Sequence, residues 1–440
     1  MNVYLMSLGC DKNRVDGEVM VGTLCVAGYD VVNNPAEAEA IIINTCGFIS
    51  DAVKESLDTI FELAEYKKGR CRALIIVGCM AERYKGEIKE TIPEADAFVG
   101  VGEYEKIADI VAKYIGKAKG MSLAADNTNA RIQARKDAEA SHIAYIKISE
   151  GCDNCCTYCT IPAIRGPYKS RPMEEILDEC RLLVEYGTKE LVLVAQDTAL
   201  YGIDIYGAVK LPALLKKIAA ESGAQWIRLM YAYPEHITPT LITTIAETPQ
   251  ICKYIDMPLQ HSEDSVLSRM GRKGGRWELM QLIRVLRERI PDIAIRTTFI
   301  VGFPGETKDD FKNLYDFVKE TKFERLGVFP YSREEGTTAA TMPNQVPPAT
   351  KQNRLKKLMQ LQQEIHFENQ QKHVGKTIPV MVDSYENGEY TARTQHDAYE
   401  VDAVVTIATD KKLKLGDICN VKITSTLDYD LIGELYELTE

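Results

Sequence analysis

Three cysteines in one short run are the residues of this chain best suited to metal chemistry. Cys152, Cys156 and Cys159 form a C-x-x-x-C-x-x-C pattern within eight residues. Thiolates at this spacing can hold three irons of a cubane 4Fe–4S cluster, which leaves the fourth iron without a protein ligand. An open iron can bind a small molecule, as the open position of a catalytic zinc does. We call these residues the first triad.

A zinc site is the alternative for the same run, since Cys152 with Cys155 and Cys156 with Cys159 are also two C-x-x-C pairs. A zinc ribbon places a loop of roughly 15–20 residues between such pairs, so that the chain can wrap around the ion. Here the two pairs abut. The spacing therefore favours the cluster and leaves Cys155 outside the ligand set.

Three further cysteines each follow a short apolar run near the start of the chain. They are Cys10, Cys46 and Cys79, each beside a glycine that permits close backbone approach. If the runs are parallel strands, their carboxyl ends lie on one sheet edge, where ligands bind. Cysteine is also a common buried residue, and Cys25 and Cys71, which lack this placement, are interpreted as structural. The shared placement predicts a second three-cysteine cluster with its own open iron, and we call these cysteines the second triad.

Residues 1–118 alternate strand and helix patterns, which predicts a parallel sheet covered by helices. Short apolar runs indicate the strands, and apolar residues at helical spacing indicate the helices. The predicted strands are 3–8, 40–44, 73–77 and 97–99, and the predicted helices are 15–27, 51–66, 82–90 and 103–115. Residues 119–140 are polar and irregular and are predicted to form a linker.

Residues 141–373 carry a second and longer alternation of strands and helices. The predicted strands are 145–149, 190–195, 227–231, 254–257, 293–301 and 325–329, and a long helix is predicted over 350–373. Six strand–helix units in this length predict a partial (β/α)6 barrel, and such barrels carry their chemistry at the carboxyl ends of the strands. The first triad directly follows the first of these strands.

Residues 375–440 change to a strand pattern, with predicted strands 377–382, 390–394, 401–407 and 419–424. They predict a small all-β barrel. The chain is therefore expected to be an α/β protein with a parallel sheet domain, a central barrel and a C-terminal all-β barrel. The C-terminal barrel holds 13 acidic and 6 basic side chains, a net charge of −7.

Bulk properties predict a cytoplasmic protein. A chain of 440 residues suits about three domains, and 45% hydrophobic with 27% charged residues is ordinary for a globular chain. No run approaches the ~20 apolar residues of a membrane span, and the first residues lack the basic start of a signal peptide. Twelve cysteines in a cytosolic chain favour metal or catalysis over disulfides. The net charge of −11 argues against general nucleic-acid affinity and permits a basic protein partner.

The first triad, with Tyr158 before its last cysteine, resembles the radical S-adenosylmethionine (SAM) signature. Over essentially the whole chain, the domain order and local motifs resemble the ribosomal protein methylthiotransferases, a branch of the radical SAM methylthiotransferase family. The C-terminal barrel resembles a TRAM domain. The matching motifs are residues 7–16 (with Asp11 where proline is usual), 44–49, 77–84, 195–198, 257–261, 298–307 and 327–337.

This resemblance implies a reaction that uses two 4Fe–4S clusters and SAM. SAM would chelate the open iron at the first triad, and its reductive cleavage would give a 5′-deoxyadenosyl radical. That radical would take a hydrogen from the unactivated β-carbon of an aspartate in small-subunit ribosomal protein twelve. The carbon radical would accept a methylthio group held at the second triad, after a separate SAM had methylated the sulfur. A reductant such as a flavodoxin is implied as a partner.

Five residues of the central barrel are candidates for contacting SAM. Gly302 and Gly305 form a Gly-Phe-Pro-Gly loop that would let the backbone approach the adenine, or is an ordinary turn. Gln196 and Asp197 would bind the methionine end or the ribose, or close the barrel rim. Tyr158 would shield the cluster from water, or simply pack.

Three other polar residues near these strand ends are given no catalytic role. His261 is interpreted as a structural histidine. Arg165 and Arg171, just past the first triad, would meet an acidic side chain or remain solvated, which is the commoner case for arginine.

Two other functions stay open at this point. A tRNA adenosine methylthiotransferase is the alternative within the family, but a TRAM-like barrel that grips tRNA should be basic. A net charge of −7 suits a ribosomal protein rich in Lys and Arg instead. A non-enzymatic iron–sulfur scaffold is the alternative from another class, and it would ligate every iron and need no glycine-rich loop at a barrel mouth.

Overall fold

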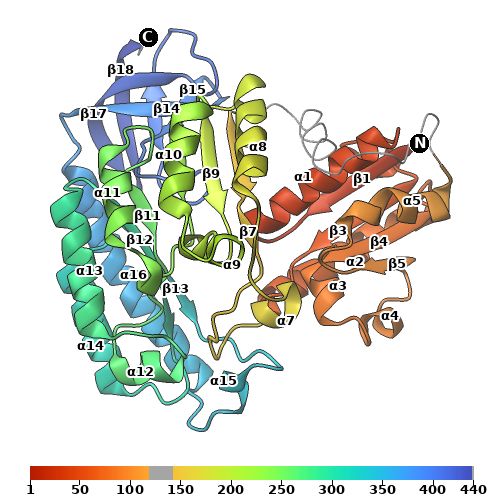
Figure 1. Cartoon of the computed structure of the whole chain (residues 1–440), viewed down its shortest axis with the longest axis horizontal. Coiled ribbons are helices and arrows are strands. Elements are labelled where there is room, and N and C mark those ends of the chain that lie inside the picture. The colour runs from red at the N-terminus through yellow and green to blue at the C-terminus, as the bar shows by residue number, and fades with distance from the viewer. Residues whose placement is uncertain (118–141, 439–440) are drawn as a thin grey trace. The chain divides into compact units, whose positions relative to one another are not determined.

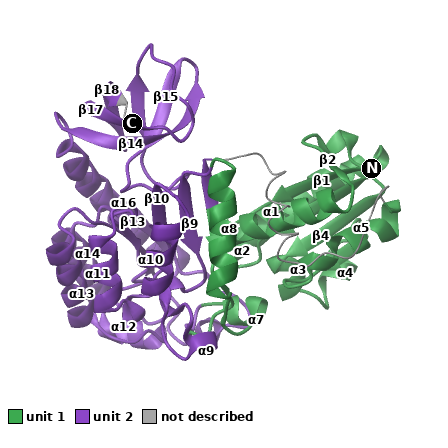
Figure 2. Ribbon diagram, turned by 45° about the horizontal axis from the view of Figure 1, so that its top comes forward, with its two compact units in different colours: residues 1–141, 145–154, 159–187 green, residues 142–144, 155–158, 188–440 purple. Residues whose placement is uncertain are grey.

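The computed structural model describes residues 1–117 and 142–438, and these residues divide into two compact units (Figure 2). The first comprises residues 1–117, 145–154 and 159–187, and the second comprises 142–144, 155–158 and 188–438. The predicted linker over 119–140 lies outside the described residues. Among the helices of the described residues, none is both long and apolar enough to cross a membrane.

A parallel sheet organises the amino-terminal part of the first unit (Figure 1). Its strand order is β2-β1-β3-β4-β5, and its pairings are parallel, as predicted; the short strand β2 was not predicted. The strands are β1 (Asn2–Ser7), β2 (Asp30–Val31), β3 (Ala40–Thr45), β4 (Ala73–Gly78) and β5 (Ala97–Val99). The helices are α1 (Asp11–Val26), α2 (Ser50–Ala64), α3 (Cys79–Arg83), α4 (Ile88–Thr91) and α5 (Ile107–Ile115). The single helix predicted over 82–90 was wrong, because a turn that contains Gly86, a poor helix former, separates α3 from α4.

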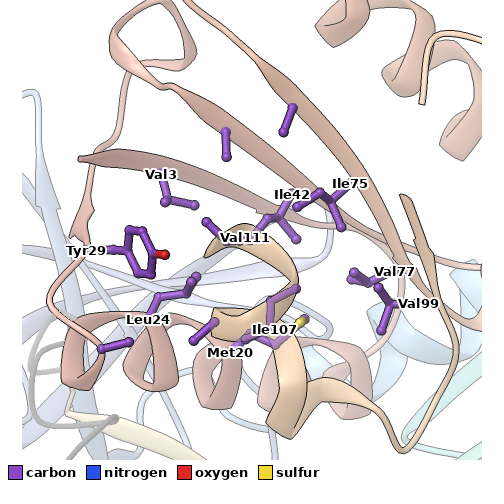
Figure 3. Close-up of a cluster of buried hydrophobic side chains, with 14 of the residues drawn as sticks. Val3, Met20, Leu24, Tyr29, Ile42, Ile75, Val77, Val99, Ile107 and Val111 are labelled. Atoms are coloured by element: carbon purple, nitrogen blue, oxygen red, sulfur yellow. The ribbon is translucent and has the colours of Figure 1, made fainter. Parts of the chain in front are cut away.

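Alternating side chains give this sheet two apolar faces. One face, which includes Ile42 and Ile75, packs on α1 and α5 (Figure 3). The opposite face, which includes Ile41 and Leu74, belongs to a cluster with Ile60 of α2. Every residue of β3 and β4 is buried, so a ligand can reach these strands only at their ends.

The first unit also holds the segments on both sides of the first triad. Strand β7 (Ser149–Glu150) pairs antiparallel with β8 (Lys169–Ser170). The loop of residues 151–159 has no helix or strand and leads into α7 (Ile161–Arg165), and α8 (Met173–Glu185) follows β8. The paired strands therefore fix both ends of the segment that carries the first triad.

The central strands form two three-stranded sheets. One sheet has the order β10-β9-β6, and another has β11-β12-β13. A parallel bridge between Ile227 and Ile251 links β10 to the segment that leads into β11. The strands are β6 (Ile143–Lys147), β9 (Glu190–Val194), β10 (Trp226–Leu229), β11 (Tyr254–Asp256), β12 (Ala294–Val301) and β13 (Arg325–Pro330). All six predicted strands are present, and the partial (β/α)6 architecture is confirmed.

Helices connect and cover these strands (Figure 1). They are α9 (Ile203–Tyr206), α10 (Leu211–Glu221), α11 (Pro239–Glu247), α12 (Asp264–Arg269), α13 (Arg276–Arg289), α14 (Lys308–Thr321), α15 (Thr338–Thr341) and α16 (Pro348–Gln371). Helix α16 is the long helix predicted over 350–373, and its buried residues include Leu358, Leu361 and Ile365.

The C-terminal strands close into a barrel with the order β14-β15-β16-β18-β17. They are β14 (Thr377–Glu386), β15 (Glu389–Arg393), β16 (Val405–Ala408), β17 (Ile418–Leu427) and β18 (Asp430–Leu438). Its interior contains Val380, Val382, Ile407 and Val421. The sequence did not predict β18, because Gly433 interrupts its short apolar pattern and glycine weakens a strand signal.

A buried charged network joins this C-terminal barrel to the strands of the central barrel. Arg393 donates to Glu190 (2.8 Å) and to Asp383 (2.6 Å). Glu190 also accepts from Arg228 at 2.6 Å, and His142 lies 2.8 Å from Asp383. All five side chains are buried, so each charge depends on its partner rather than on water.

Two further contacts join the C-terminal barrel to the central strands in the same way. Arg325 donates to Asp397 at 2.9 Å, and Tyr254 donates to Asp402 at 2.8 Å. Glu190, Tyr254 and Arg325 are the first residues of β9, β11 and β13. The C-terminal barrel therefore packs against the amino ends of these strands, and their carboxyl ends stay available for chemistry.

We expect Arg393→Met to destabilise the second unit by about 3–5 kcal/mol at neutral pH, because it leaves Glu190 and Asp383 buried without their shared cation. The midpoint of urea unfolding measures the loss. The matched control is Lys422→Met, at an exposed position of β17, and it should change the midpoint little.

The buried ion pair of Arg393 with Glu190 also predicts that the free energy of unfolding depends on pH. Burial alone would raise the pKa of Glu190, but Arg228 and Arg393 outweigh it and hold that pKa below its usual value. The stabilisation is therefore complete above the unfolded pKa of about 4.3 and is lost as pH falls through the lower folded pKa. If Arg393→Met had the same urea-unfolding midpoint as the parent at neutral pH, both the stabilisation by this ion pair and its dependence on pH would be contradicted.

Candidate functional site

The second triad lies at the carboxyl ends of neighbouring parallel strands. Cys10 precedes α1 just after β1, Cys46 directly follows β3, and Cys79 is the first residue of α3, directly after β4. The loops that carry them pack closely, since a Cβ added at Gly9 would come within 2.8 Å of the Cys46 Cβ and 3.0 Å of its sulfur. A larger residue at position 9 would therefore displace Cys46.

Asparagine and threonine side chains tie the three strand ends together. Asn13 donates to the carbonyls of Leu8 (2.8 Å) and Thr45 (3.1 Å). Asn44 donates to the Asn13 carbonyl at 2.7 Å, and the Thr45 hydroxyl donates to the Val77 carbonyl at 2.6 Å. The sequence reading gave these residues no role, although polar Asn44 and Thr45 in an otherwise isoleucine-rich strand were a usable signal.

A buried cluster of charges lies beside Cys79. Arg165 Nη2 donates to the Cys79 sulfur at 3.2 Å, and Arg165 Nη1 donates to Asp16 (2.9 Å) and Glu150 (3.0 Å). Lys147 pairs with both carboxylates. The Arg165 side chain is 1% exposed, so the interpretation of this residue as solvated was wrong.

Arg171 also has an acidic partner. It donates to Glu179 at 2.7 Å and to the Lys147 carbonyl at 2.9 Å. Its interpretation as solvated was wrong as well. Both arginines follow the alternative that the sequence left open, a pairing with an acidic side chain, because their segment is covered and a guanidinium out of water needs a partner.

Burial sets the electrostatics of the second triad. It raises the pKa of the Cys79 thiol to about 11, against the lowering effect of the Arg165 guanidinium, and it also raises the pKa of Cys46. In the part of the chain that the structure describes, no three His, Cys, Asp or Glu side chains converge closely enough to hold one metal ion. A cubane offers a separate iron to each thiolate, so its ligands need not converge on one point. Three thiols on one sheet edge beside a cationic side chain fit such a cluster.

The first triad lies in the loop of residues 151–159, directly after β7. Cys152 is buried, Cys156 and Cys159 are partly exposed, and Cys155 is exposed. The Cys152 amide donates to the Gly166 carbonyl at 3.1 Å, which ties the start of the loop to the end of α7. The loop fits a cluster in its donor set, because it offers three thiols within eight residues.

The part of this loop in the second unit is fixed by the segment that ends α12. The Thr157 amide donates to the Met270 carbonyl (3.0 Å), and its hydroxyl donates to the Arg269 carbonyl (2.8 Å). Tyr158 packs edge-on against Phe303, with ring centroids 6.4 Å apart. The loop of the first triad therefore contacts the loop of Gly302 and Gly305, which was predicted to approach SAM.

Cys156 has two aromatic and cationic neighbours that the sequence reading missed. Its sulfur is hydrogen-bonded to the hydroxyl of Tyr233. Arg272 stacks over the Tyr233 ring, 3.6 Å from its centroid. The usable signal was the position of Tyr233, which lies just beyond the carboxyl end of β10.

The loop with Gly302 and Gly305 follows β12 and has the left-handed backbone that favours glycine, with φ of +74° and +78°. Glu306 shapes it from within, since its carboxylate accepts from the Phe303 amide at 3.0 Å. Arg269 shapes it from outside by donating to the Pro304 carbonyl at 3.1 Å. Contacts with the side chains of Glu306 and Arg269 therefore fix the backbone conformation of this loop.

Asp197 is buried and occupied by protein partners. One carboxylate oxygen accepts from the Ala199 amide (3.1 Å), and the other lies 2.7 Å from His236 Nδ1. These contacts fit the reading of Asp197 as a residue of the barrel rim, with the half-buried Gln196 beside it. His261 is fully buried and its Nδ1 accepts from the Glu263 amide at 3.0 Å, which agrees with a structural role.

Comparison with family models and solved structures defines the class of protein. Residues 146–318 match the model of the radical SAM superfamily, residues 374–435 match the TRAM domain, and residues 2–100 match a model described as uncharacterized protein family UPF0004. The fold is similar to a radical SAM methyltransferase, TsrM from Kitasatospora setae, solved with cobalamin and a [4Fe-4S] cluster (TM-score 0.55, 15% identity, 77% of this chain and 76% of that one). The radical SAM enzyme OxsB is also similar (TM-score 0.51, 12% identity, 82% and 56%).

Sequence relatives of nearly full length define the family within that class. The chain is 46% identical to a protein of Clostridium tetani, covering 98% of this chain and 97% of that one. It is 47% identical to one of Desulforamulus reducens (99% and 99%) and 46% identical to one of Geobacter sulfurreducens (98% and 98%). Each of these is named ribosomal protein uS12 methylthiotransferase RimO. The chain belongs to this RimO family.

Proposed function

We propose that this chain is a cytoplasmic radical SAM methylthiotransferase that adds a methylthio group to the β-carbon of an aspartate in uS12, the small-subunit ribosomal protein twelve. The observation that carries the proposal is the second triad, placed on one sheet edge of a chain that already contains the radical SAM triad. A radical SAM fold alone accounts for the first triad only. Relatives of nearly full length that are named for the uS12 reaction support the substrate.

In this proposal, Cys152, Cys156 and Cys159 hold one 4Fe–4S cluster, and Cys10, Cys46 and Cys79 hold the other. The bound clusters supply an electron for reductive cleavage of SAM at the first site and an iron to carry the transferred sulfur at the second. The loop of Gly302 and Gly305 gives its backbone to the adenine of SAM. Tyr158 keeps water from the first site, and Gln196 and Asp197 line the rim. A flavodoxin-type reductant is the external source of that electron.

Charge on the C-terminal barrel favours uS12 over tRNA. Asp383, Asp397 and Asp402 are buried in the network described above, so these carboxylates do not contribute to an outer face. Asp383 is therefore not available to a partner. With these three and the buried Arg393 set aside, ten acidic and five basic side chains remain in residues 375–440. The outside stays acidic, which suits a basic protein and repels phosphates.

We expect reversal of the exposed acidic face, with Glu386, Glu389 and Asp428 all changed to lysine, to raise the Kd for uS12 about tenfold at low salt. SAM cleavage should be unchanged, because these residues lie on the C-terminal barrel. The effect should shrink as salt rises, since screening shortens to about 8 Å near physiological ionic strength. Binding of purified uS12 at several salt concentrations measures it.

The matched control changes three exposed acidic residues of α14, Asp309, Asp316 and Glu320, to lysine. It alters the net charge by the same amount at another place and should leave the Kd for uS12 nearly unchanged. Tighter binding and modification of tRNA by the barrel variant would instead support the tRNA alternative, because added lysines contact phosphates.

Mass spectrometry of the small-subunit ribosomal proteins tests the function directly. A strain without this gene should lack the methylthio mass shift on uS12, and the gene supplied in trans should restore it. An unchanged uS12 mass would overturn the proposed substrate. Incubation of the anaerobically reconstituted protein with SAM and dithionite separates an enzyme from a passive scaffold, because only the enzyme releases 5′-deoxyadenosine.

A further inference from the structure

Arg165 is a buried cation in direct contact with a sulfur of the second triad, 86 residues away in sequence. Its Nη2 donates to the Cys79 sulfur at 3.2 Å and to the side-chain oxygen of Asn13 at 3.0 Å. We propose that Arg165 is a positioning residue of the second cluster, whose hydrogen bond to Cys79 orients that ligand and raises the reduction potential of the cluster. This inference rests on the proposed function, since it requires a cluster at the second triad.

The guanidinium is fixed on its other side as well. Nη1 donates to Asp16 at 2.9 Å and to Glu150 at 3.0 Å, and the side chain is 1% exposed. A planar fork held by two carboxylates and an amide has one orientation, so the second N–H of Nη2 points at the sulfur. A lysine has one compact ammonium and cannot reach these partners at once.

The local charges balance without any cluster. Arg165 and Lys147 face Asp16 and Glu150, two cations against two carboxylates. What Arg165 adds is therefore the donated hydrogen bond rather than a net positive field. Hydrogen bonds to cluster sulfurs set reduction potential, because they stabilise the additional negative charge of the reduced state. Loss of this bond should make the cluster harder to reduce.

Arg165→Lys tests the inference, because it keeps the charge and removes the fork. The parent for this test is the full-length chain with Cys152, Cys156 and Cys159 changed to alanine, so that only the second cluster titrates. We expect the variant to keep its iron and to show a midpoint potential more negative by a tenfold change in the reduction equilibrium, about 59 mV for one electron. Potentiometric titration followed by electron paramagnetic resonance measures it.

Arg171→Lys is the matched control, since it also replaces a guanidinium bound to a buried carboxylate, Glu179. Its potential and iron content should equal those of the parent. Loss of iron in Arg165→Lys alone, with an unchanged melting temperature, also supports a positioning role.

If Arg165→Lys does not fold, the double variant Arg165→Gln with Glu150→Gln removes one cation and one carboxylate together and keeps the pocket neutral. The same negative shift is expected in it. Unchanged potential and unchanged iron in a folded Arg165 variant would overturn the inference. Absence of iron from the parent would instead overturn the proposed function, and this inference with it.

Discussion

Replacement of Cys152, Cys156 and Cys159 together by alanine is expected to leave about four of about eight irons per chain and to abolish cleavage of SAM. The three thiols lie in one irregular loop, and removing all of them leaves that loop with Cys155 alone, a single thiol that cannot hold a cluster. In the proposed arrangement, the remaining irons would be held by Cys10, Cys46 and Cys79, at the edge of the amino-terminal sheet. Iron analysis and release of 5′-deoxyadenosine under dithionite are the two measurements.

Cys155→Ala is the control for this experiment, because Cys155 lies in the same loop but outside the triad spacing. It should keep both the iron and the activity. About eight irons in the triple variant would show that the loop holds no cluster. Loss of iron in Cys155→Ala would show that the spacing had been read with the wrong cysteines.

Replacement of Cys10, Cys46 and Cys79 by alanine should have the opposite pattern. SAM cleavage should persist, because the first triad is intact, while methylthiolated uS12 should fall below detection. The physical reason is that no iron would remain to hold the transferred sulfur. The measurements are 5′-deoxyadenosine release and the mass of uS12 in the same reaction mixture.

Cys25→Ala together with Cys71→Ala provides the comparison for that variant. Both residues belong to the same amino-terminal sheet domain, and the Cys71 sulfur lies 3.2 Å from the Ala73 carbonyl. This pair of changes should preserve transfer. Full product from the chain without Cys10, Cys46 and Cys79 would rule out the mechanism with two clusters.

Local pattern was enough to predict most of the fold. Isoleucine runs such as residues 41–43 are buried on both faces of a parallel sheet, and such strands read the same in sequence and in space. The pattern failed where a glycine interrupts it, at Gly86 between two short helices and at Gly433 inside β18. At Gly86 the glycine itself interrupts the predicted helix, whereas at Gly433 the pairing with β16 and β17 maintains the strand.

The placement of Cys10, Cys46 and Cys79 at the ends of parallel strands was predictable from the sequence, and the contacts of these side chains were not. Cysteine spacing and a shared position after strands point to both triads from sequence alone. Arg165 meets Cys79 and Asp16 only because the fold returns residue 165 to a sheet edge built from residues 1–100. No periodicity carries that information. For the same reason, the acidic count of the C-terminal barrel could not show which carboxylates are buried.

The placement of the C-terminal barrel constrains how this chain can be re-engineered or can diverge. Its outer face can change sign without touching the fold, since Glu386, Glu389 and Asp428 are exposed. Its inner face cannot, because Asp383, Arg393 and Asp397 belong to the buried ion pairs at the amino ends of the central strands. A recognition domain transplanted from another enzyme would have to bring these three residues with it, or meet unpaired charges in the recipient. The charge of the outer surface can therefore change by substitution, whereas exchange of the whole barrel requires that its buried charged residues match those of the central strands.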